Sequence, residues 1–512
     1  MLTTEMIERG ARQFANRTAI LFGEVALTFA DVNNLANQMA RALDRQGVAP
    51  GRRIGLLVNN GPYSVSMDFA CTKAGAIRVP LNGRLSAAEH IRMLAAMNAD
   101  LVIFGPGLED RATELRAALP GLRLLGLGAG DDEQDLLNLA GGEPVEAPAH
   151  RPAPDDVVLA LYTSGTSGVL KAAEHTQASY AAVALNILNN LVDPVEGDVM
   201  LHAASMIHAS GTFVLPFWIR GATSAVLPGF TPAVYLEAIR TWRPTVLNLV
   251  PTMIGMLLDH PGMLPTQFDS VHTLIYGASP MPGPLMERAL DVFGLRLVQY
   301  YGQTEAPLAI ASLSKADHRP EFAHRRLACG FPSIDCELRL LDSEGMPAAP
   351  GEPGEIVVRA PFLMKGYHGA AELNAETFLP DGWLKTRDIG RFDADGCLYL
   401  VDRLSEMIVS GGYNVYPKEV EDALTAHSDV REAAVVGLPD DKWGEAVTGF
   451  VVLREPGLVS EQDLIGFVRD RLAAYKTPKA IRFVDDIPKS AVGKPMRRLL
   501  REPFWAGRER AI

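Results

Sequence analysis

One ten-residue stretch constrains the fold more than any other part of the chain, because it joins a strand pattern directly to a glycine-rich loop. Residues 162–171 read YTSGTSGVLK, and residues 157–162, VVLALY, predict a buried strand that runs into it. Glycines let a backbone approach a phosphate closely, and successive N–H groups in such a loop form an anion-binding nest. Hydroxyl side chains and the ammonium group of Lys171 add further donors. The strand and loop together predict a polyphosphate site.

This loop is not of the Walker type, which requires GxxxxGK followed by Ser or Thr. Here Gly165 and Gly168 precede Lys171, and Ala172 follows the lysine. A stretch of this composition can equally be a surface turn, so its interpretation depends on the rest of the chain.

Chain length and composition limit the class of protein. Because hydrophobic cores stop growing near ~250–300 residues, a chain of 512 residues is expected to form at least two domains. A net charge of −13 argues against nucleic-acid binding. Four cysteines without CxxC spacing fit a reducing cytoplasm. The charged N-terminal segment and the lack of a long apolar run predict neither a signal peptide nor a transmembrane helix.

Short apolar runs alternate with helical patterns along the first half of the chain. This alternation predicts an α/β fold, in which mixed, mostly parallel sheets are flanked by helices. Residues 126–154 are rich in Gly, Pro and acidic residues and predict a loop. Strands are predicted at residues 54–58, 101–104, 223–227 and 246–250, and helices at residues 232–241 and at residues 26–44, with Thr28 as N-cap.

The pattern changes after the strand predicted at residues 397–401. The last ~110 residues predict a compact α+β unit of ordinary domain size. We therefore expect a large N-terminal domain at residues 1–402 and a small C-terminal domain at residues 403–512.

Six further motifs follow the loop in order. They are YGASPMPG (276–283), YYGQTEAP (300–307), GEIVVR (354–359), DGWLKTRD (381–388), LVDRLSEMIVSGGYNVYPKEVE (400–421) and PKSAVGK (488–494). Together with the loop they resemble the adenylate-forming (AMP-binding) superfamily, in its acyl-CoA synthetase branch. The resemblance covers nearly the whole chain. It implies an N-terminal adenylation domain and a mobile C-terminal lid, with a hinge near Ser405.

The resemblance also implies a site for ATP and Mg²⁺. Thr304 would contact the α-phosphate, Glu305 would bind Mg²⁺ with Thr166, and Asp388 would hold the ribose hydroxyls, assisted by Arg403. Carboxylate and hydroxyl oxygens are ligands that Mg²⁺ prefers. The remaining residues of this ATP site are those of the loop and of the adenine site: Thr163, Ser164, Gly165, Thr166, Ser167, Gly168, Lys171, Gly277, Ala278, Ser279, Tyr301 and Gly302.

Four residues are expected to act in catalysis: Lys494, Thr304, Glu305 and His208. A carboxylate needs a better leaving group before a thiol can attack it, and formation of an acyl-adenylate supplies AMP. In the family, the lysine that Lys494 matches offsets negative charge in that step. His208 matches a gate between the acyl pocket and the thiol tunnel. Taken alone, Glu305 and Lys494 would be solvated side chains, and His208 a structural histidine.

Residues expected to contact CoA lie in the C-terminal part. Gly411 and Gly412 would allow a close approach of pantetheine. The other candidates are Trp443, which can equally be a core residue, and Tyr475, Lys476 and Lys479.

The acyl-pocket positions carry no arginine or lysine. A second carboxylate on the substrate would therefore be unpaired, which disfavours dicarboxylates. No aspartate occurs at residues 207–212, which disfavours amino acids. A fatty or aryl acid fits best. These positions are Ser210, Gly211, Thr212, Tyr276, Ala306, Pro307 and Leu308, beside His208 and Gly277.

Two positions depart from the family pattern. Leu170 stands where a proline is usual, and Ser405 stands where Asp or Lys is usual at the hinge. The resemblance favours an acid–CoA ligase. The alternative is a stand-alone adenylating enzyme that passes its acyl group to a carrier protein or another nucleophile. A homodimer is compatible with the sequence, which does not fix the oligomeric state.

Overall fold

The computed structural model describes residues 1–83, 85–129, 134–164, 170–207, 209–279, 281–403, 406–410, 413–440, 442–457, 459–489 and 495–505. The chain forms two compact units. The first comprises Met1–Leu338 and Val358–Leu384, and the second comprises Arg339–Val357 and Lys385–Ile512. A domain boundary at residues 402 and 403 stays a prediction.

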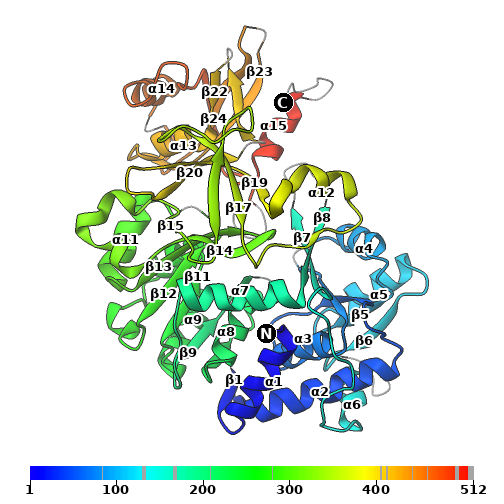
Figure 1. Ribbon diagram of the computed structural model, residues 1–512. Coiled ribbons are helices and arrows are strands. Elements are labelled where there is room, and N and C mark those ends of the chain that lie inside the picture. The colour runs from blue at the N-terminus through cyan, green and yellow to red at the C-terminus, as the bar shows by residue number, and fades with distance from the viewer. Residues whose placement is uncertain are drawn as a thin grey trace. The chain divides into compact units, whose positions relative to one another are not determined.

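Two sheets organise the first unit (Figure 1). One has the order β18-β8-β7-β4-β3-β5-β6. Strands β7, β4, β3, β5 and β6 are parallel, β8 runs antiparallel to β7, and β18 runs antiparallel to β8. Its strands are β3 (Arg53–Leu57), β4 (Ile77–Pro80), β5 (Leu101–Phe104), β6 (Arg123–Gly126), β7 (Val157–Ser164), β8 (Leu170–Thr176) and β18 (Gly366–Tyr367).

The other sheet has the order β15-β14-β13-β12-β11-β9-β10-β1-β2. Strands β13, β12, β11, β9, β10 and β1 are parallel. At one edge β14 runs antiparallel to β13 and β15 antiparallel to β14, and at the other edge β2 runs antiparallel to β1. Its strands are β1 (Thr18–Phe22), β2 (Val25–Thr28), β9 (Val199–His202), β10 (Thr223–Val226), β11 (Val246–Leu249), β12 (Thr273–Gly277), β13 (Leu297–Gln303), β14 (Ala306–Leu313) and β15 (Phe331–Pro332).

Helices cover these sheets, and α7 packs against strands of both. The α-helices of the first unit are α1 (Thr3–Gln13), α2 (Phe29–Arg45), α3 (Ser64–Lys73), α4 (Ala87–Ala96), α5 (Glu109–Ala118), α6 (Leu136–Gly141), α7 (Gln177–Asn190), α8 (Val214–Trp218), α9 (Pro232–Trp242), α10 (Pro251–Leu258), α11 (Gly283–Phe293) and α12 (Ala371–Thr377). Short 3₁₀ helices are η1 (Ala209–Phe213), η2 (Pro265–Phe268), η3 (Lys315–His318), η4 (Pro320–Arg325) and η5 (Pro380–Gly382).

Local sequence signals explain several of these elements. The Thr28 side chain accepts a hydrogen bond from the Asp31 N–H and caps α2, which buries Met39 and Leu43 on one face. The four predicted strands correspond to β3, β5, β10 and β11, and the helix predicted at 232–241 is α9. The loop predicted at 126–154 was wrong in part, because it contains α6. Asp135 caps that helix by accepting from the Leu137 N–H, and Leu136 is buried.

The second unit is a mixed α+β structure. It holds a four-stranded sheet in the order β16-β17-β19-β20 and a five-stranded sheet in the order β22-β21-β24-β23, in which β25 pairs with β24. The strands are β16 (Glu337–Leu341), β17 (Gly354–Arg359), β19 (Leu384–Phe392), β20 (Leu398–Arg403), β21 (Ile408–Ser410), β22 (Tyr413–Val415), β23 (Val430–Asp440), β24 (Gly444–Leu453) and β25 (Ala480–Phe483), and the helices are α13 (Pro417–Thr425), α14 (Glu461–Arg469) and α15 (Arg497–Trp505).

The observed architecture confirms the predicted α/β fold with a smaller α+β part. All four cysteines are buried, and none of them forms a disulfide within the part of the chain that the structure describes. Among the helices that the structure describes, none has the length and apolar character needed to cross a membrane.

Candidate active site

Strands β7 and β8 pair around the glycine-rich loop, so the predicted strand does run into it. Tyr162 lies opposite Ala172, and the pairing continues to the last residues before the loop. Residues 165–169 lie outside the described part of the chain, and so do the side chains of residues 163, 164 and 170. The phosphate-binding roles of Thr163, Ser164, Gly165, Thr166, Ser167 and Gly168 therefore stay predictions.

Lys171, on β8 at the base of this loop, lies close to Tyr367 of β18. The Lys171 ammonium lies 5.7 Å from the centre of the Tyr367 ring. The Tyr367 hydroxyl donates a 2.6 Å hydrogen bond to Oε1 of Glu305. A charged acceptor makes such a bond short and strong. One phenol thus connects the loop lysine to the carboxylate that was predicted to bind Mg²⁺.

A small cavity lies beside Lys171. It has a volume of about 170 Å³ and is lined in part by Tyr162, Tyr367 and Met97. Burial raises the pKa of Tyr162 to about 12, and its hydroxyl donates to the Met93 carbonyl at 2.9 Å. This phenol therefore stays neutral and serves to fix β7.

A buried histidine holds the turn that carries Thr304 and Glu305. These two residues connect β13 to β14. Nε2 of His175 donates to the Thr304 carbonyl oxygen at 2.9 Å. Burial, assisted by the positive charge of Arg78, lowers the pKa of His175 to about 4, although the bond to Thr304 opposes the shift. The ring is therefore neutral near pH 7.

Sequence reasoning missed both His175 and Tyr367. His175 lies four residues beyond Lys171, and Tyr367 lies in the Gly-Tyr-His stretch at residues 366–368. A single aromatic residue after a glycine carries little information by itself. The structure brings Tyr367 close to Glu305 through the pairing of β18 with β8 and through a 2.9 Å hydrogen bond from the Met364 N–H to the Glu305 carbonyl.

The predicted adenine residues follow two adjacent parallel strands. Gly277 ends β12 and residues 278–279 follow it, while residues 301–302 lie in the last part of β13. They therefore meet at the carboxyl edge of the sheet, where open α/β sheets bind ligands. A Cβ at Gly277 would lie 2.5 Å from the Tyr300 carbonyl oxygen, so this position requires glycine. Ala278 has a φ of 64°, a strained value for alanine that is typical of functional sites. Ser279 follows it, and Tyr301 is buried.

The same edge carries the turn after β13. A Cβ at Gly302 would collide with the backbone of Leu308, which has a φ of 62°. Ala306 and Leu308 are buried, and Pro307 between them is half-buried. This close backbone approach fixes the shape of the turn around Thr304 and Glu305.

Acyl-pocket candidates follow β9 at this carboxyl edge. Ser210 hydrogen-bonds Nδ1 of the buried His202 at 3.0 Å, and His202 Nε2 bonds Ser224 at 3.3 Å. A Cβ at Gly211 would collide with the Met206 carbonyl, so only glycine fits. Thr212 is half-buried in η1, and His208 lies outside the described residues.

Tyr276 is oriented by a histidine that the sequence did not indicate. Nδ1 of His318 donates to the Ser314 carbonyl at 2.8 Å, so its Nε2 accepts from the Tyr276 hydroxyl at 3.0 Å. Both side chains are fully buried, and burial lowers the pKa of His318. Their polar atoms are paired with each other, which leaves the ring of Tyr276 as apolar surface.

In the second unit, Asp388 lies directly opposite Arg403 in the pairing of β19 with β20. Asp388 is buried, and its backbone N–H donates a hydrogen bond to Thr386 Oγ1 at 3.1 Å. The side chain of Arg403 lies outside the described part, so its predicted contact with ribose or phosphate stays a prediction.

The structure brings together the predicted CoA residues of the second unit in two groups. Two ammonium groups lie near the Trp443 ring, that of Lys442 at 4.8 Å and that of Lys479 at 5.1 Å from the ring centre. Tyr475 stacks on Tyr413 with ring centres 4.9 Å apart.

Lys476, next in the chain, is already committed to an ion pair. Its Nζ lies 2.7 Å from Oε1 of Glu419. The remaining predicted residues of this unit, Gly411, Gly412, Ser405 and Lys494, lie outside the described part of the chain.

Comparison with known proteins bears out the family resemblance. The AMP-binding enzyme family matches residues 7–368, and the AMP-binding enzyme C-terminal domain matches residues 419–494. A feruloyl-CoA synthase from Amycolatopsis is 37% identical, covering 97% of this chain and 98% of that relative. A medium/long-chain-fatty-acid–CoA ligase from Mycobacterium tuberculosis is 34% identical, covering 98% of this chain and 90% of that relative.

A solved structure shares the architecture as well. The amide bond synthetase McbA from Marinactinospora thermotolerans superimposes with a TM-score of 0.89 at 29% identity. The match covers 98% of this chain and 100% of that one.

Proposed function

Because the chain belongs to the AMP-binding enzyme family, we propose that it activates a fatty or aryl carboxylic acid with ATP and transfers the acyl group to CoA. The protein is thus an AMP-forming acyl-CoA synthetase. The observation that carries the proposal is the contact of Tyr367 with both Lys171 and Glu305. It joins a cation suited to phosphate with a hard oxygen ligand at the base of the glycine-rich loop.

The first step forms an acyl-adenylate. A carboxylate oxygen attacks the α-phosphorus of ATP, the bond from that phosphorus to the bridging oxygen breaks, and pyrophosphate leaves. Lys171 would bind the departing phosphates, and Thr304 would contact the α-phosphate. His175 serves this step by holding the Thr304 backbone in place. Positioning and charge stabilisation of this kind are the main sources of rate in phosphate chemistry.

Glu305 suits a magnesium ion. Its carboxylate uses one oxygen in the bond from Tyr367, and the fixed side chain can offer the other to a hard cation. When bound, Mg²⁺ would neutralise phosphate charge. Tyr367 would orient the carboxylate toward it.

The second step transfers the acyl group. The thiol sulfur of CoA attacks the acyl carbon, the bond from that carbon to the AMP oxygen breaks, and the thiol proton is released. Trp443 and the cations of Lys442 and Lys479 form a surface suited to the anionic, aromatic nucleotide of CoA.

The hydrogen bonding of the predicted acyl-pocket residues supports an apolar acid as the substrate. The hydroxyls of Tyr276 and Ser210 are hydrogen-bonded to His318 and His202. Ala306 contributes only apolar surface. A second carboxylate would find no cation among these positions, which favours monocarboxylic acids.

Mass spectrometry of reactions with ATP and Mg²⁺ tests this function. The panel contains fatty acids of increasing length, benzoates, cinnamates, malonate and succinate, each with and without CoA. We expect acyl-CoA, AMP and pyrophosphate from at least one fatty or aryl acid, and none from the dicarboxylates. Glu305→Gln is the inactive control. Absence of pyrophosphate with every acid would reject the proposal.

A second acceptor class is suggested by the similarity to an amide bond synthetase. Acyl-AMP or AMP without acyl-CoA would show that adenylation occurs and that the acceptor is a carrier protein or an amine. The same reactions with added carrier protein and with simple amines then identify the nucleophile.

A further inference from the structure

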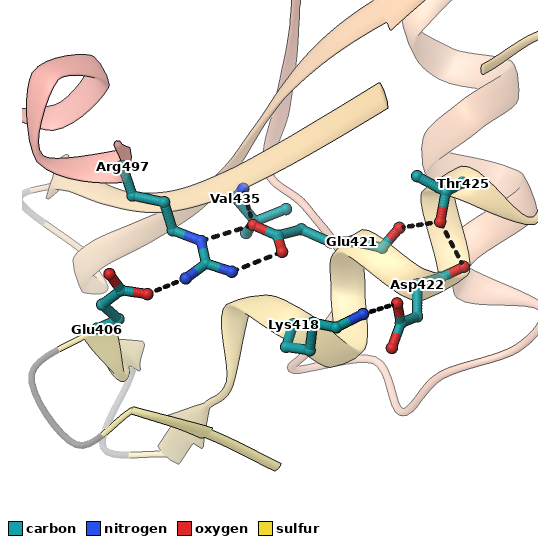
Figure 2. Close-up of polar contacts among 7 residues, drawn as sticks. All are labelled: Glu406, Lys418, Glu421, Asp422, Thr425, Val435 and Arg497. Carbon is teal, nitrogen blue, oxygen red and sulfur yellow. Dashed lines mark hydrogen bonds and ion pairs between the residues drawn. The ribbon is translucent and has the colours of Figure 1, made fainter. Parts of the chain in front are cut away.

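Arg497, the first residue of α15, joins two acidic side chains of the second unit (Figure 2). Its Nε and Nη2 donate to Oε1 and Oε2 of Glu421 at 2.7 and 2.6 Å. Its Nη1 pairs with Oε2 of Glu406. The exposed fractions of the Arg497, Glu421 and Glu406 side chains are only 14%, 9% and 17%. A two-pronged arginine–carboxylate pair in such surroundings fixes geometry as well as charge.

Glu421 is itself held in place. Its Oε1 also accepts from the backbone N–H of Val435 on β23 at 2.8 Å. Figure 2 shows Glu421 extending from α13 toward Arg497, with Val435 beside it. Arg497 therefore ties the start of α15 to an anchor that is shared by α13 and β23.

The ion pairs join two segments that lie next to predicted functional residues in the chain. Glu406 directly follows the predicted hinge residue Ser405, and Arg497 stands three positions after Lys494. The described residues on either side of 490–494 are also joined. Lys489 and Pro495 form an isolated antiparallel β-bridge, and the Met496 N–H donates to the Pro488 carbonyl at 2.7 Å.

Stability alone is a weak reason for such a buried cluster. Removing two carboxylates and a guanidinium from water costs free energy that their attraction only partly offsets, so buried ion pairs often add little net stability. What they do supply is one defined arrangement of the joined segments.

We propose that Arg497 is a positioning residue for adenylate formation. Its ion pairs with Glu421 and Glu406 fix the start of α15, which begins three positions after Lys494 in the chain. The inference rests on the proposed function, in which Lys494 offsets charge at the α-phosphate.

Arg497→Met tests this role, with Arg498→Met as the matched control. Arg498 lies on the same helix and makes an exposed ion pair with Glu502. Because small misplacements of a reacting group can cost ~10²-fold, we expect the kcat of pyrophosphate release to fall about tenfold to 100-fold in Arg497→Met. The KM values for ATP and acid, and transfer to CoA from added synthetic acyl-AMP, should be nearly unchanged. Arg497→Lys should restore part of the rate, and Arg498→Met should match the unaltered enzyme.

A double variant separates positioning from a general structural role. If Arg497 acts through Lys494, Arg497→Met should cause no further loss of adenylation in a Lys494→Ala background. Independent, multiplicative losses in the double variant would overturn the inference. Glu406→Gln preserves the pair with Glu421 and guards against misfolding; it should lower the same kcat several-fold, in line with loss of a charge-assisted hydrogen bond.

The outcomes distinguish this inference from the proposed function. Failure of the unaltered enzyme to release pyrophosphate with any acid would reject the function, and the inference with it. If Arg497→Met releases pyrophosphate at an unchanged rate, only the role of Arg497 is rejected. If Arg497→Met does not fold, unchanged release by both Glu406→Gln and Arg497→Lys rejects that role instead.

Discussion

The hydroxyl of Tyr367 donates a 2.6 Å hydrogen bond to Oε1 of Glu305, although 62 residues separate the two in the chain. The pairing of β18 with β8, which carries Lys171, holds Tyr367 on one side, and the bond from the Met364 N–H to the Glu305 carbonyl joins the same segment to Glu305. Tyr367 thus lies beside both Lys171, at the base of the glycine-rich loop, and the predicted metal ligand.

Tyr367→Phe should weaken the magnesium response. The ring beside Lys171 remains, but the donor that orients Glu305 is lost, and a charge-assisted hydrogen bond is worth about 1.5–3 kcal/mol. We expect the Mg²⁺ concentration for half-maximal pyrophosphate release to rise several-fold, with little change in Tm. Tyr162→Phe, which removes the neighbouring phenol that bonds Met93, is the matched control. An unchanged Mg²⁺ response in Tyr367→Phe would show that the phenol does not orient Glu305.

Gly302→Ala should destabilise the turn after β13. Its Cβ would meet the backbone of Leu308, which cannot move aside as a flexible side chain would. Overpacking of this kind typically costs about 1–3 kcal/mol. Urea unfolding measures the loss, and Gly141→Ala, where no atom lies within 4 Å of the new Cβ, should be nearly neutral. Equal stability of the two variants would mean that the turn tolerates a shift.

Two buried histidines should make the protein less stable in mild acid. Burial lowers the pKa of both His175 and His202 from 6.5 to about 4. Below pH 6.5 the unfolded chain binds protons that the folded chain does not, so the free energy of unfolding falls between pH 6.5 and pH 4. Each histidine contributes on the order of 3 kcal/mol. Urea unfolding at several pH values should show a shallower slope in His175→Asn and the shallowest in a variant that also carries His202→Gln. Parallel slopes in all three proteins would contradict the assignment.

Trp443→Ala should affect the second half-reaction alone. The ring lies close to the ammonium groups of Lys442 and Lys479, and its removal takes away apolar surface from the predicted CoA contact. We expect the KM for CoA to rise several-fold because stacking on an aromatic ring is worth about 1–3 kcal/mol per base. Pyrophosphate release without CoA should be unchanged. Phe483→Ala, at an exposed position of the same unit, is the control. A fall in adenylation with no change in the KM for CoA would instead identify Trp443 as a core residue.

The sequence predicted the class of fold and the candidate residues because those signals are local. A strand pattern running into a hydroxyl-rich loop, the capping of α2 by Thr28 and the ordered motifs each depend on neighbours in the chain. The helix α6 was missed because a helix of six residues, capped by Asp135, leaves almost no periodic pattern among glycines and prolines.

Only the tertiary structure decided which side chains support the site. The sequence around four of these side chains does not indicate which residue each one contacts: Tyr367, His175, His318 and Arg497. Each contacts its partner because strand pairing or packing brings distant segments together. The sequence alone therefore determined the chemistry that the chain carries. The fold determined how that chemistry is held, since burial and hydrogen bonding depend on residues that meet only when the chain is packed.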